Sequence, residues 1–260
     1  MKNNMSHGEQ EIYFSLEPGN IYEVRLIKNI VRLKKETLLI LLSRLVKKGW
    51  LTRLKKGVYV VNFPDGKMLT DPFLTALNIF GGYLGFSSAL YVYGVMDEYP
   101  STVYVCTSKK SALRVYDKNI EIKAVALGKR ATGAVYLKNY FVSSKGKTLY
   151  DCFYMPEHSG GYSNILAAIP RLKLSSYDWK VFLFYLKKFG NGSLSRKIGF
   201  MLELLTSSVK SVVPQELLKE LNVGKQIIKL GSGSNGKFIK KWGIVNYIPE
   251  KDLIGKITYG

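Results

Sequence analysis

A stripe of apolar residues between positions 34 and 48 constrains the fold of this chain more than any other feature of its sequence. The steps of three and four residues that mark one face of an α-helix are followed by Leu38, Leu41, Leu42, Leu45 and Val46. Gly49 comes directly after the stripe, and glycine is typical of a helix end. The sequence therefore predicts a helix over residues 34–48. Leu39 and Ile40 widen the stripe beyond one face, which indicates a second packing partner.

Two short runs rich in β-forming residues follow this helix. They cover residues 50–54 and 58–62 and are joined by Lys55-Lys56-Gly57. A glycine-bearing turn between two such runs predicts a β-hairpin. A hairpin directly after an amphipathic helix is the arrangement expected for a wing.

Two further helices are predicted upstream. A short one covers residues 9–15 and is followed by the breaker Glu17-Pro18-Gly19, and the second covers residues 22–30, where Val24, Ile27 and Val31 recur at helical spacing. Three helices followed by a hairpin predict a winged helix-turn-helix domain over residues 1–62. Residues 63–66, Phe-Pro-Asp-Gly, have the composition of a linker.

The rest of the chain mixes helical and strand patterns without regular alternation. Strands are predicted over residues 102–107, 121–127 and 134–141. Helices are predicted as a pair within residues 73–95 and as single elements over 164–169, 178–189 and 194–206. A terminal hairpin is predicted within residues 231–259. The apolar share of 47% can supply a core, so we expect residues 67–260 to form a larger mixed domain and the whole chain to be α+β.

Positive charge is concentrated on the predicted third helix and the hairpin. The chain has 39 Lys and Arg against 19 Asp and Glu, a formal net charge of +20. Residues 24–57 contain eleven basic residues and one acid, Glu36, so half of the net charge lies in this segment. Such an excess attracts a polyanion, and a solvated basic surface is the alternative interpretation.

A helix and a basic hairpin in this order suit duplex DNA. A helix fits the major groove, where the residues near its N-terminus, here Lys34, Lys35 and Thr37, reach base edges. The hairpin tip would follow the neighbouring phosphates, which supply affinity rather than sequence choice. The predicted DNA-contacting residues are Arg32, Lys34, Lys35, Thr37, Arg44, Lys47, Lys48, Arg53, Lys55 and Lys56.

A catalytic function has two weak sequence indications. Glu121 and Lys123, with Asp97 or Asp117 upstream, resemble the acid, acid-x-Lys pattern of metal-dependent nucleases, although alternating Glu and Lys is common on an exposed strand. The alternative hypothesis is therefore a nuclease docked on DNA by the winged helix.

Asp151, Cys152 and His158 lie close in sequence, as a nucleophile and its base do in some enzymes. Catalytic pairs usually meet across the fold, so a buried cysteine and a loop histidine are the simpler interpretation. Two cysteines and two histidines leave almost no ligands for a zinc site. We expect no metal site, no cofactor and no catalysis.

The sequence also bears on the compartment. Two distant cysteines indicate a reducing environment, and no apolar signal segment follows Met1. Residues 72–96 carry no charge, but their glycines favour two short buried helices over one membrane span. We expect a cytoplasmic protein without a membrane partner.

Several segments resemble a known family of regulators. They are residues 42–60 (LSRLVKKGWLTRLKKGVYV), 83–91 with Gly94, 100–107, 142–151 and 196–203 (RKIGFMLE). These segments resemble the AbiEi-type antitoxins of abortive-infection systems, and the likeness extends from about residue 9 to residue 203.

The resemblance implies a repressor that binds promoter repeats upstream of its own operon. It also implies that the larger domain counteracts a nucleotidyltransferase-like toxin without forming a stable complex with it. The chain departs from the family at Lys145-Gly146-Lys147, where Pro, Glu and Arg often stand. This departure bears on antitoxin activity rather than on DNA binding, and a regulator without a toxin partner is the alternative.

Overall fold

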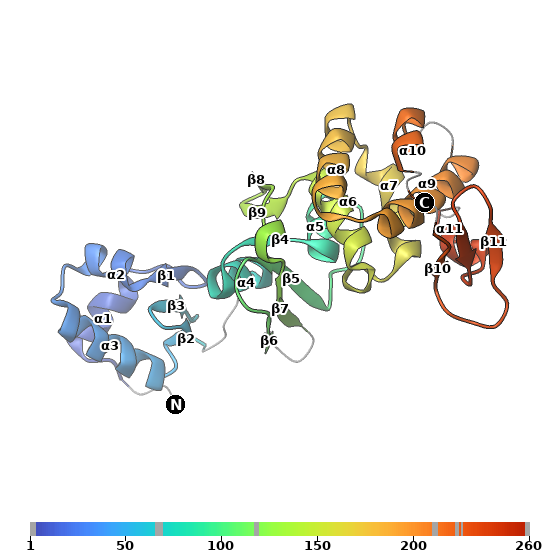
Figure 1. Cartoon of the computed structure of the whole chain (residues 1–260). Coiled ribbons are helices and arrows are strands. Elements are labelled where there is room, and N and C mark those ends of the chain that lie inside the picture. Colours follow the sequence, from blue (N-terminus) through green and yellow to red (C-terminus); the bar gives the residue numbers. More distant parts are fainter. Residues whose placement is uncertain are drawn as a thin grey trace. The chain divides into compact units, whose positions relative to one another are not determined.

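The computed structural model describes residues 4–65, 70–116, 120–209, 213–221, 224 and 226–257. The chain forms two compact units, residues 1–81 and 82–260 (Figure 1). Helices and strands occur in both units, so the predicted α+β class is confirmed. The division between the compact units falls after Gly81, whereas the sequence predicted a domain boundary between residues 62 and 67. The position at which the N-terminal domain ends as an independently folding part stays a prediction.

The first unit is a small helical layer with a three-stranded sheet. Its helices are α1 (His7–Phe14), α2 (Val24–Val31), α3 (Lys35–Lys47) and α4 (Pro72–Phe80). Its strands are β1 (Ile21–Glu23), β2 (Leu51–Lys55) and β3 (Val58–Val61). The sheet has the order β1-β3-β2 and both pairings are antiparallel. The predicted three helices and hairpin are confirmed.

One expectation for this unit is wrong. Tyr22 was expected to begin the second helix, but it lies in β1 and pairs with Tyr59 of β3. The edge of β3 not used by β2 offers backbone donors and acceptors, and pairing satisfies those of residues 21–23 before the helix begins at Val24. This pairing joins residues far apart in sequence, which helical spacing alone does not reveal.

The first unit has a core on each side of its sheet. The larger one joins the helices and includes the fully buried residues Ile12, Ile27, Leu38, Leu42, Leu45 and Leu51. On the other side, Leu54, Val58 and Val60 pack with Ile21 of β1 and Ile79 of α4. Every residue of β3 is buried because both of its faces are covered.

The second unit contains a six-stranded mixed sheet. Its strands are β4 (Tyr83–Leu84), β5 (Thr102–Thr107), β6 (Ala112–Val115), β7 (Glu121–Ala126), β8 (Ala134–Leu137) and β9 (Tyr140–Ser143). The order is β6-β7-β5-β4-β9-β8, with β5–β7 and β4–β9 parallel. A short 3-10 turn, η1 (Gly128–Arg130), follows β7.

The strand predicted over residues 134–141 is wrong in one respect, because it is two strands. Lys138 and Asn139 have φ of 47° and 70°, so both lie in the left-handed region. Two successive residues with positive φ make the tight turn that suits a hairpin, and β8 folds back on β9. The sequence Lys-Asn lacks the glycine that usually marks such a turn.

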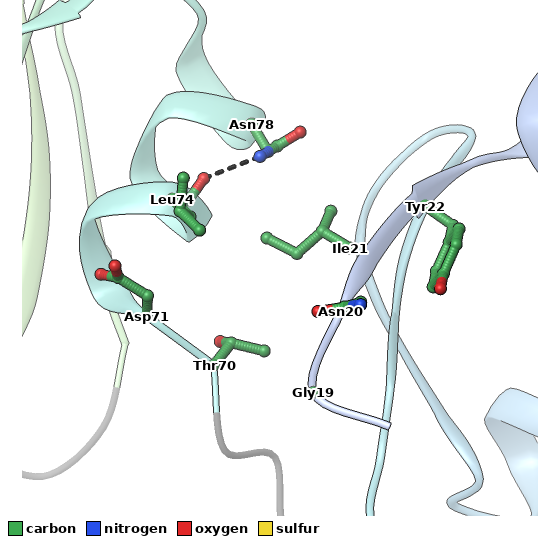
Figure 2. Close-up of a pocket in the computed structure, with 8 residues that line it drawn as sticks. All are labelled: Gly19, Asn20, Ile21, Tyr22, Thr70, Asp71, Leu74 and Asn78. Carbon is green, nitrogen blue, oxygen red and sulfur yellow. Dashed lines mark hydrogen bonds between the residues drawn. The ribbon is translucent and has the colours of Figure 1, made fainter. Parts of the chain in front are cut away.

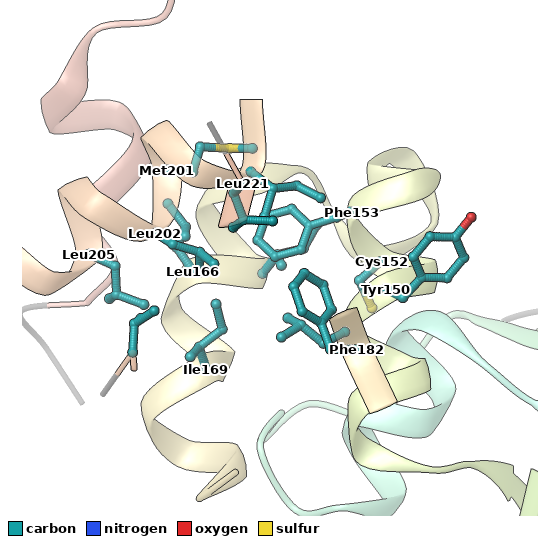
Figure 3. Close-up of a cluster of buried hydrophobic side chains, with 14 of the residues drawn as sticks. Tyr150, Cys152, Phe153, Leu166, Ile169, Phe182, Met201, Leu202, Leu205 and Leu221 are labelled. Atoms are coloured by element: carbon teal, nitrogen blue, oxygen red, sulfur yellow. The ribbon is translucent and has the colours of Figure 1, made fainter. Parts of the chain in front are cut away.

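Helices cover the rest of the second unit. They are α5 (Phe86–Val92), α6 (Lys145–Tyr154), α7 (Tyr162–Leu172), α8 (Ser176–Phe189), α9 (Gly192–Ser208), α10 (Gln215–Leu221) and α11 (Glu250–Ile254), with a 3-10 turn η2 (Pro156–Ser159). Their core includes Phe153, Leu166, Ile169, Phe182 and Leu202 (Figure 3). The predicted helices are confirmed, whereas α6, α10 and α11 were not predicted; α11 lies within the range 231–259 in which a terminal hairpin was expected.

The C-terminal part adds a small sheet of β10 (Ile228–Leu230), β11 (Lys237–Ile239) and β12 (Ile244–Asn246). β11 and β12 form the predicted hairpin, whose last expected residues, 258 and 259, lie outside the described residues. β10 pairs in parallel with β12 and was not predicted.

The uncharged segment 72–96 forms two helices, as predicted, separated by β4. Within the described ranges, no helix has both the length and the apolar character that a membrane crossing requires.

Candidate nucleic-acid interface

The turn between α2 and α3 sets the geometry of the basic segment. α2 ends at Val31 and is capped by Arg32, whose φ of 52° places it in the left-handed region and whose N–H donates to Lys28 O at 2.9 Å. Lys34 is extended and caps α3. Two helices joined by such a short turn form a helix-turn-helix, in which the second helix is the element suited to the major groove.

The basic residues of α3 lie at its two ends and are exposed. Lys34, Lys35 and Thr37 occupy its N-terminal end, and Arg44 and Lys47 follow toward its C-terminal end. The opposite face of the helix is buried in the core of the first unit. The structure therefore presents these five predicted residues, together with exposed Arg32, to solvent.

Lys48, also a predicted DNA contact, is held within the fold. Its Nζ lies 2.6 Å from Glu9 Oε2 and 3.0 Å from the carbonyl oxygen of Asn4. Burial by itself would raise the pKa of the Glu9 carboxyl, but hydrogen bonds from Lys48 and from the Ser6 N–H hold that pKa below its usual value. Lys48 thus joins the end of α3 to α1, and this geometry favours a structural role.

The wing is the hairpin of β2 and β3, with Gly57 at its turn in the left-handed region, φ 80°. Arg53 and Lys56 are exposed. Lys55 is half-buried, and its Nζ donates to Ile79 O of α4 at 3.2 Å. Of the ten predicted residues, eight are therefore exposed, while Lys48 and Lys55 are engaged by other parts of the first unit.

Leu39 and Ile40 are exposed as well, to 41% and 55%. No described segment covers them, so the second packing partner expected from the wide apolar stripe is absent from the described chain. The sequence showed these two residues as apolar positions outside the three- and four-residue spacing of the buried face. It could not distinguish a second buried face from an exposed apolar one.

A cleft of about 260 Å³ lies in the first unit between β1 and α4 (Figure 2). Ile21 reaches from β1 toward α4, with Thr70 and Asp71 at the start of the helix (Figure 2). Asp71 accepts a hydrogen bond from the Phe73 N–H at 2.8 Å, and Asn78 donates to Leu74 O at 2.9 Å. Both hydrogen bonds stabilise α4.

The residues of the nuclease hypothesis have other contacts. Arg171 of α7 donates to both carboxylate oxygens of Asp97, at 2.6 and 3.1 Å. Lys123 Nζ lies 6.0 Å from the centre of the Tyr104 ring. Asp117 falls outside the described residues. Nowhere in the part of the chain that the structure describes do three His, Cys, Asp or Glu side chains gather as a metal site.

Cys152 and His158, the pair considered as a nucleophile and its base, are both buried in the second unit. Cys152 is buried, and burial raises the pKa of its thiol to about 12, which opposes formation of a reactive thiolate. His158 stacks on Tyr104 at 4.8 Å between ring centres, and burial lowers its pKa. The arrangement fits the structural interpretation of both residues.

The family departure at residues 145–147 lies at the start of α6 and is closely packed. Lys147 is fully buried and donates to both oxygens of Asp151, one turn later, at 2.5 Å. Burial raises the pKa of Asp151 to about 6, against the opposing effect of Lys147. Gly146 lies so near Asp178 of α8 that a Cβ would sit 2.1 Å from its carbonyl oxygen. These residues seat α6 against its neighbours.

Comparisons with known proteins bear on the fold of the chain and on its basic N-terminal segment. The crystal structure of the RV2827C protein from Mycobacterium tuberculosis shares the fold, with a TM-score of 0.62 and 14% identity. The alignment covers 95% of this chain and 92% of that one. No curated protein matches the chain. Residues 30–62 match the family described as "Transcriptional regulator, AbiEi antitoxin". Over this segment, which holds the end of α2, all of α3 and the wing, the predicted resemblance to AbiEi-type regulators is confirmed.

Proposed function

We propose that this chain is a cytoplasmic repressor that binds repeats in duplex DNA upstream of its own operon. The observation that carries the proposal is the surface of the helix-turn-helix and wing, where eight of the ten predicted contact residues are exposed. The segment that matches the regulator family is the same segment. Net charge supports the same polyanionic partner.

The contacts divide by their chemistry. Arg53 and Lys56 on the wing bind phosphates, because a hairpin tip meets the backbone before it meets base edges. Lys34, Lys35 and Thr37 enter the major groove, where a lysine donates to guanine O6 and N7 and a threonine contacts thymine. Arg32, Arg44 and Lys47 lie on the same helix pair and add affinity through phosphates.

The second unit is proposed to counteract a nucleotidyltransferase-like toxin without a stable complex. The family match supports this part only through its description as an antitoxin, and it covers the DNA-binding segment alone. A regulator that has no toxin is the second form of the proposal. An adjacent nucleotidyltransferase reading frame would favour the first form.

Competition binding at fixed salt tests sequence-specific repression, with the upstream promoter duplex against a scrambled duplex of equal composition. Lys34→Ala and Lys35→Ala should each reduce the preference for promoter DNA, since a good base contact is worth about 1–3 kcal/mol of discrimination. Arg53→Ala should weaken both duplexes equally and lower the salt slope by about 0.9. Lys109→Ala, an exposed lysine of the second unit, removes the same charge and is the control.

Two results would contradict the proposal. A wild-type protein that binds promoter and scrambled DNA equally is a non-specific docking module, not a repressor. A salt slope that Arg53→Ala leaves unchanged removes the wing from the interface.

A further inference from the structure

The centre of the exposed face of α3 is not basic. Glu36, Ile40, Ser43 and Lys47 follow one another at steps of four, three and four residues, so they form one line along the helix. The first three of these residues are exposed and carry no positive charge. The cations of α3 lie at its two ends.

Ile40 is the largest apolar group on this line, and Leu39 lies beside it. Their side chains are 55% and 41% exposed, while Leu38 and Leu42 on the opposite face are fully buried. α3 therefore has two apolar surfaces, one in the core of the first unit and a smaller one on the face that carries the predicted DNA contacts.

DNA can pair with an acidic and apolar helix face only where it offers groups other than phosphates. Phosphates repel Glu36 and leave Ile40 without a partner. The floor of the major groove offers both kinds of group, because the thymine 5-methyl group is apolar and the cytosine amino group donates to a carboxylate. An acidic and apolar centre between basic ends therefore matches base edges between two phosphate backbones.

We propose that Ile40, supported by Leu39, contacts thymine 5-methyl groups in the major groove and makes the chain select sites that present them. This inference rests on the proposed function, since it names the chemistry that the same DNA-binding surface recognises. It adds apolar contacts to the polar ones assigned to Lys34, Lys35 and Thr37.

A second copy of this chain is a less suitable occupant of the apolar pair. Two α3 helices meeting through this face would bring Lys35, Arg44 and Lys47 of each copy close together. Like charges oppose that approach, whereas DNA phosphates attract the same residues.

Removal of the methyl group tests the inference directly. Duplexes enriched by the full chain from a random-sequence pool are resynthesised with uracil in place of thymine, which deletes only the 5-methyl group. Wild-type affinity should fall about fourfold for each contacted methyl, the fold-change that corresponds to about 0.8 kcal/mol for one buried methylene-sized group.

The variants locate the effect. Ile40→Ala should bind the thymine duplex more weakly than wild type does. The ratio of its affinities for the thymine and uracil duplexes should fall toward one. Ile40→Val should keep most of the difference. Leu113→Ala, at an apolar residue of β6 that is 56% exposed, should behave as wild type. Alanine is a strong helix former, and equal melting temperatures should show that Ile40→Ala still folds.

Three outcomes would overturn the inference. If uracil leaves the affinity unchanged while the protein still prefers the enriched duplex over a scrambled one, methyl contacts are refuted and the proposed repressor function stands. Failure of the pool to enrich any sequence refutes sequence-specific binding itself. A change in sedimentation of Ile40→Ala, with an unchanged uracil effect, makes the apolar pair a self-association surface.

Discussion

At the scale of single residues, Lys47 and Lys48 show how neighbouring lysines acquire different roles. Lys47 is exposed near the end of α3. Lys48 is the residue after the helix, where its amino group meets the fully buried residue Glu9 and the carbonyl oxygen of Asn4. An ion pair between exposed side chains contributes little to the free energy of unfolding. Removing the partner of a buried acid costs more, because the acid stays buried without the hydrogen bond that compensated its lost hydration.

Alanine substitutions should separate the two lysines. Lys48→Ala is expected to cost about 1–3 kcal/mol of unfolding free energy, because Glu9 loses a charged hydrogen bond while it stays buried. Lys47→Ala should stay within about 0.5 kcal/mol of wild type and instead lower DNA affinity. Urea denaturation of both variants measures the difference, and equal stabilities would contradict the structural role of Lys48.

The same ion pair predicts a pH dependence. Because the folded state lowers the pKa of Glu9, the ionised carboxylate is favoured by folding. Its contribution is complete above the ordinary glutamate pKa of about 4.3 and is lost as pH falls through the lower folded value. The stability advantage of wild type over Glu9→Gln should therefore shrink only under acidic conditions. A constant advantage from neutral pH to well below 4.3 would be inconsistent with the pair.

At the scale of elements, α9 shows why one helix carries a recognisable sequence. Arg196, Gly199 and Glu203 of the RKIGFMLE segment lie on one face and meet Trp242, in the turn between β11 and β12. Arg196 donates to the Trp242 carbonyl at 3.2 Å, and Glu203 accepts from the indole N–H at 2.6 Å. Gly199 lies under the ring, where a Cβ would sit 2.1 Å from it. α9 therefore packs against the turn of the C-terminal sheet through this face.

Gly199→Ala should therefore destabilise the second unit by about 1–3 kcal/mol, because the indole must move. In a helix interior the same change normally stabilises by about 1 kcal/mol. A Trp242→Ala background removes the clash, so there Gly199→Ala should become stabilising. Thermal unfolding of the single variants and the double variant measures this reversal of sign. The same effect in both backgrounds would show that the ring does not limit the space.

At the scale of the whole molecule, the compact N-terminal unit extends beyond the wing. Ile79 of α4 packs against Leu54, Val58 and Val60 of the β2–β3 hairpin, and Lys55 bonds to the carbonyl oxygen of Ile79. α4 therefore covers the face of the wing sheet that lies opposite the helical core. A fragment that ends at residue 62 lacks this cover.

A fragment of residues 1–81 should resist urea better than a fragment of residues 1–62. Full burial of an isoleucine side chain stabilises by about 1.5–3 kcal/mol, so the loss of the partly buried Ile79 should cost less than this. Both fragments retain the helix-turn-helix and wing residues, so the same promoter duplex can be used to check binding. Equal urea midpoints would show that α4 adds nothing to the N-terminal unit. Limited proteolysis near residues 63–66 gives an independent measure of the junction.

Much of the secondary structure follows from local sequence. α3, the β2–β3 hairpin and β5 were predicted because their apolar spacing and turn residues act over a few neighbouring positions. α6 was missed because its buried face includes Lys147 and Asp151, which have the polarity of surface residues. The structure shows that they form a buried ion pair with each other. The Lys138-Asn139 turn was missed because its conformation is set by the pairing of β8 with β9.

The sequence by itself determined the α+β class, the helix-turn-helix with its wing and the concentration of positive charge on that segment, since each depends on residue type and spacing. Only the tertiary structure decided which of those charges face solvent. Lys48 and Lys55 found partners in α1 and α4, segments distant in sequence, while Leu39 and Ile40 found none within the described chain. Exposure depends on what packs against a helix, and that is set by long-range burial of apolar surface rather than by the helix itself.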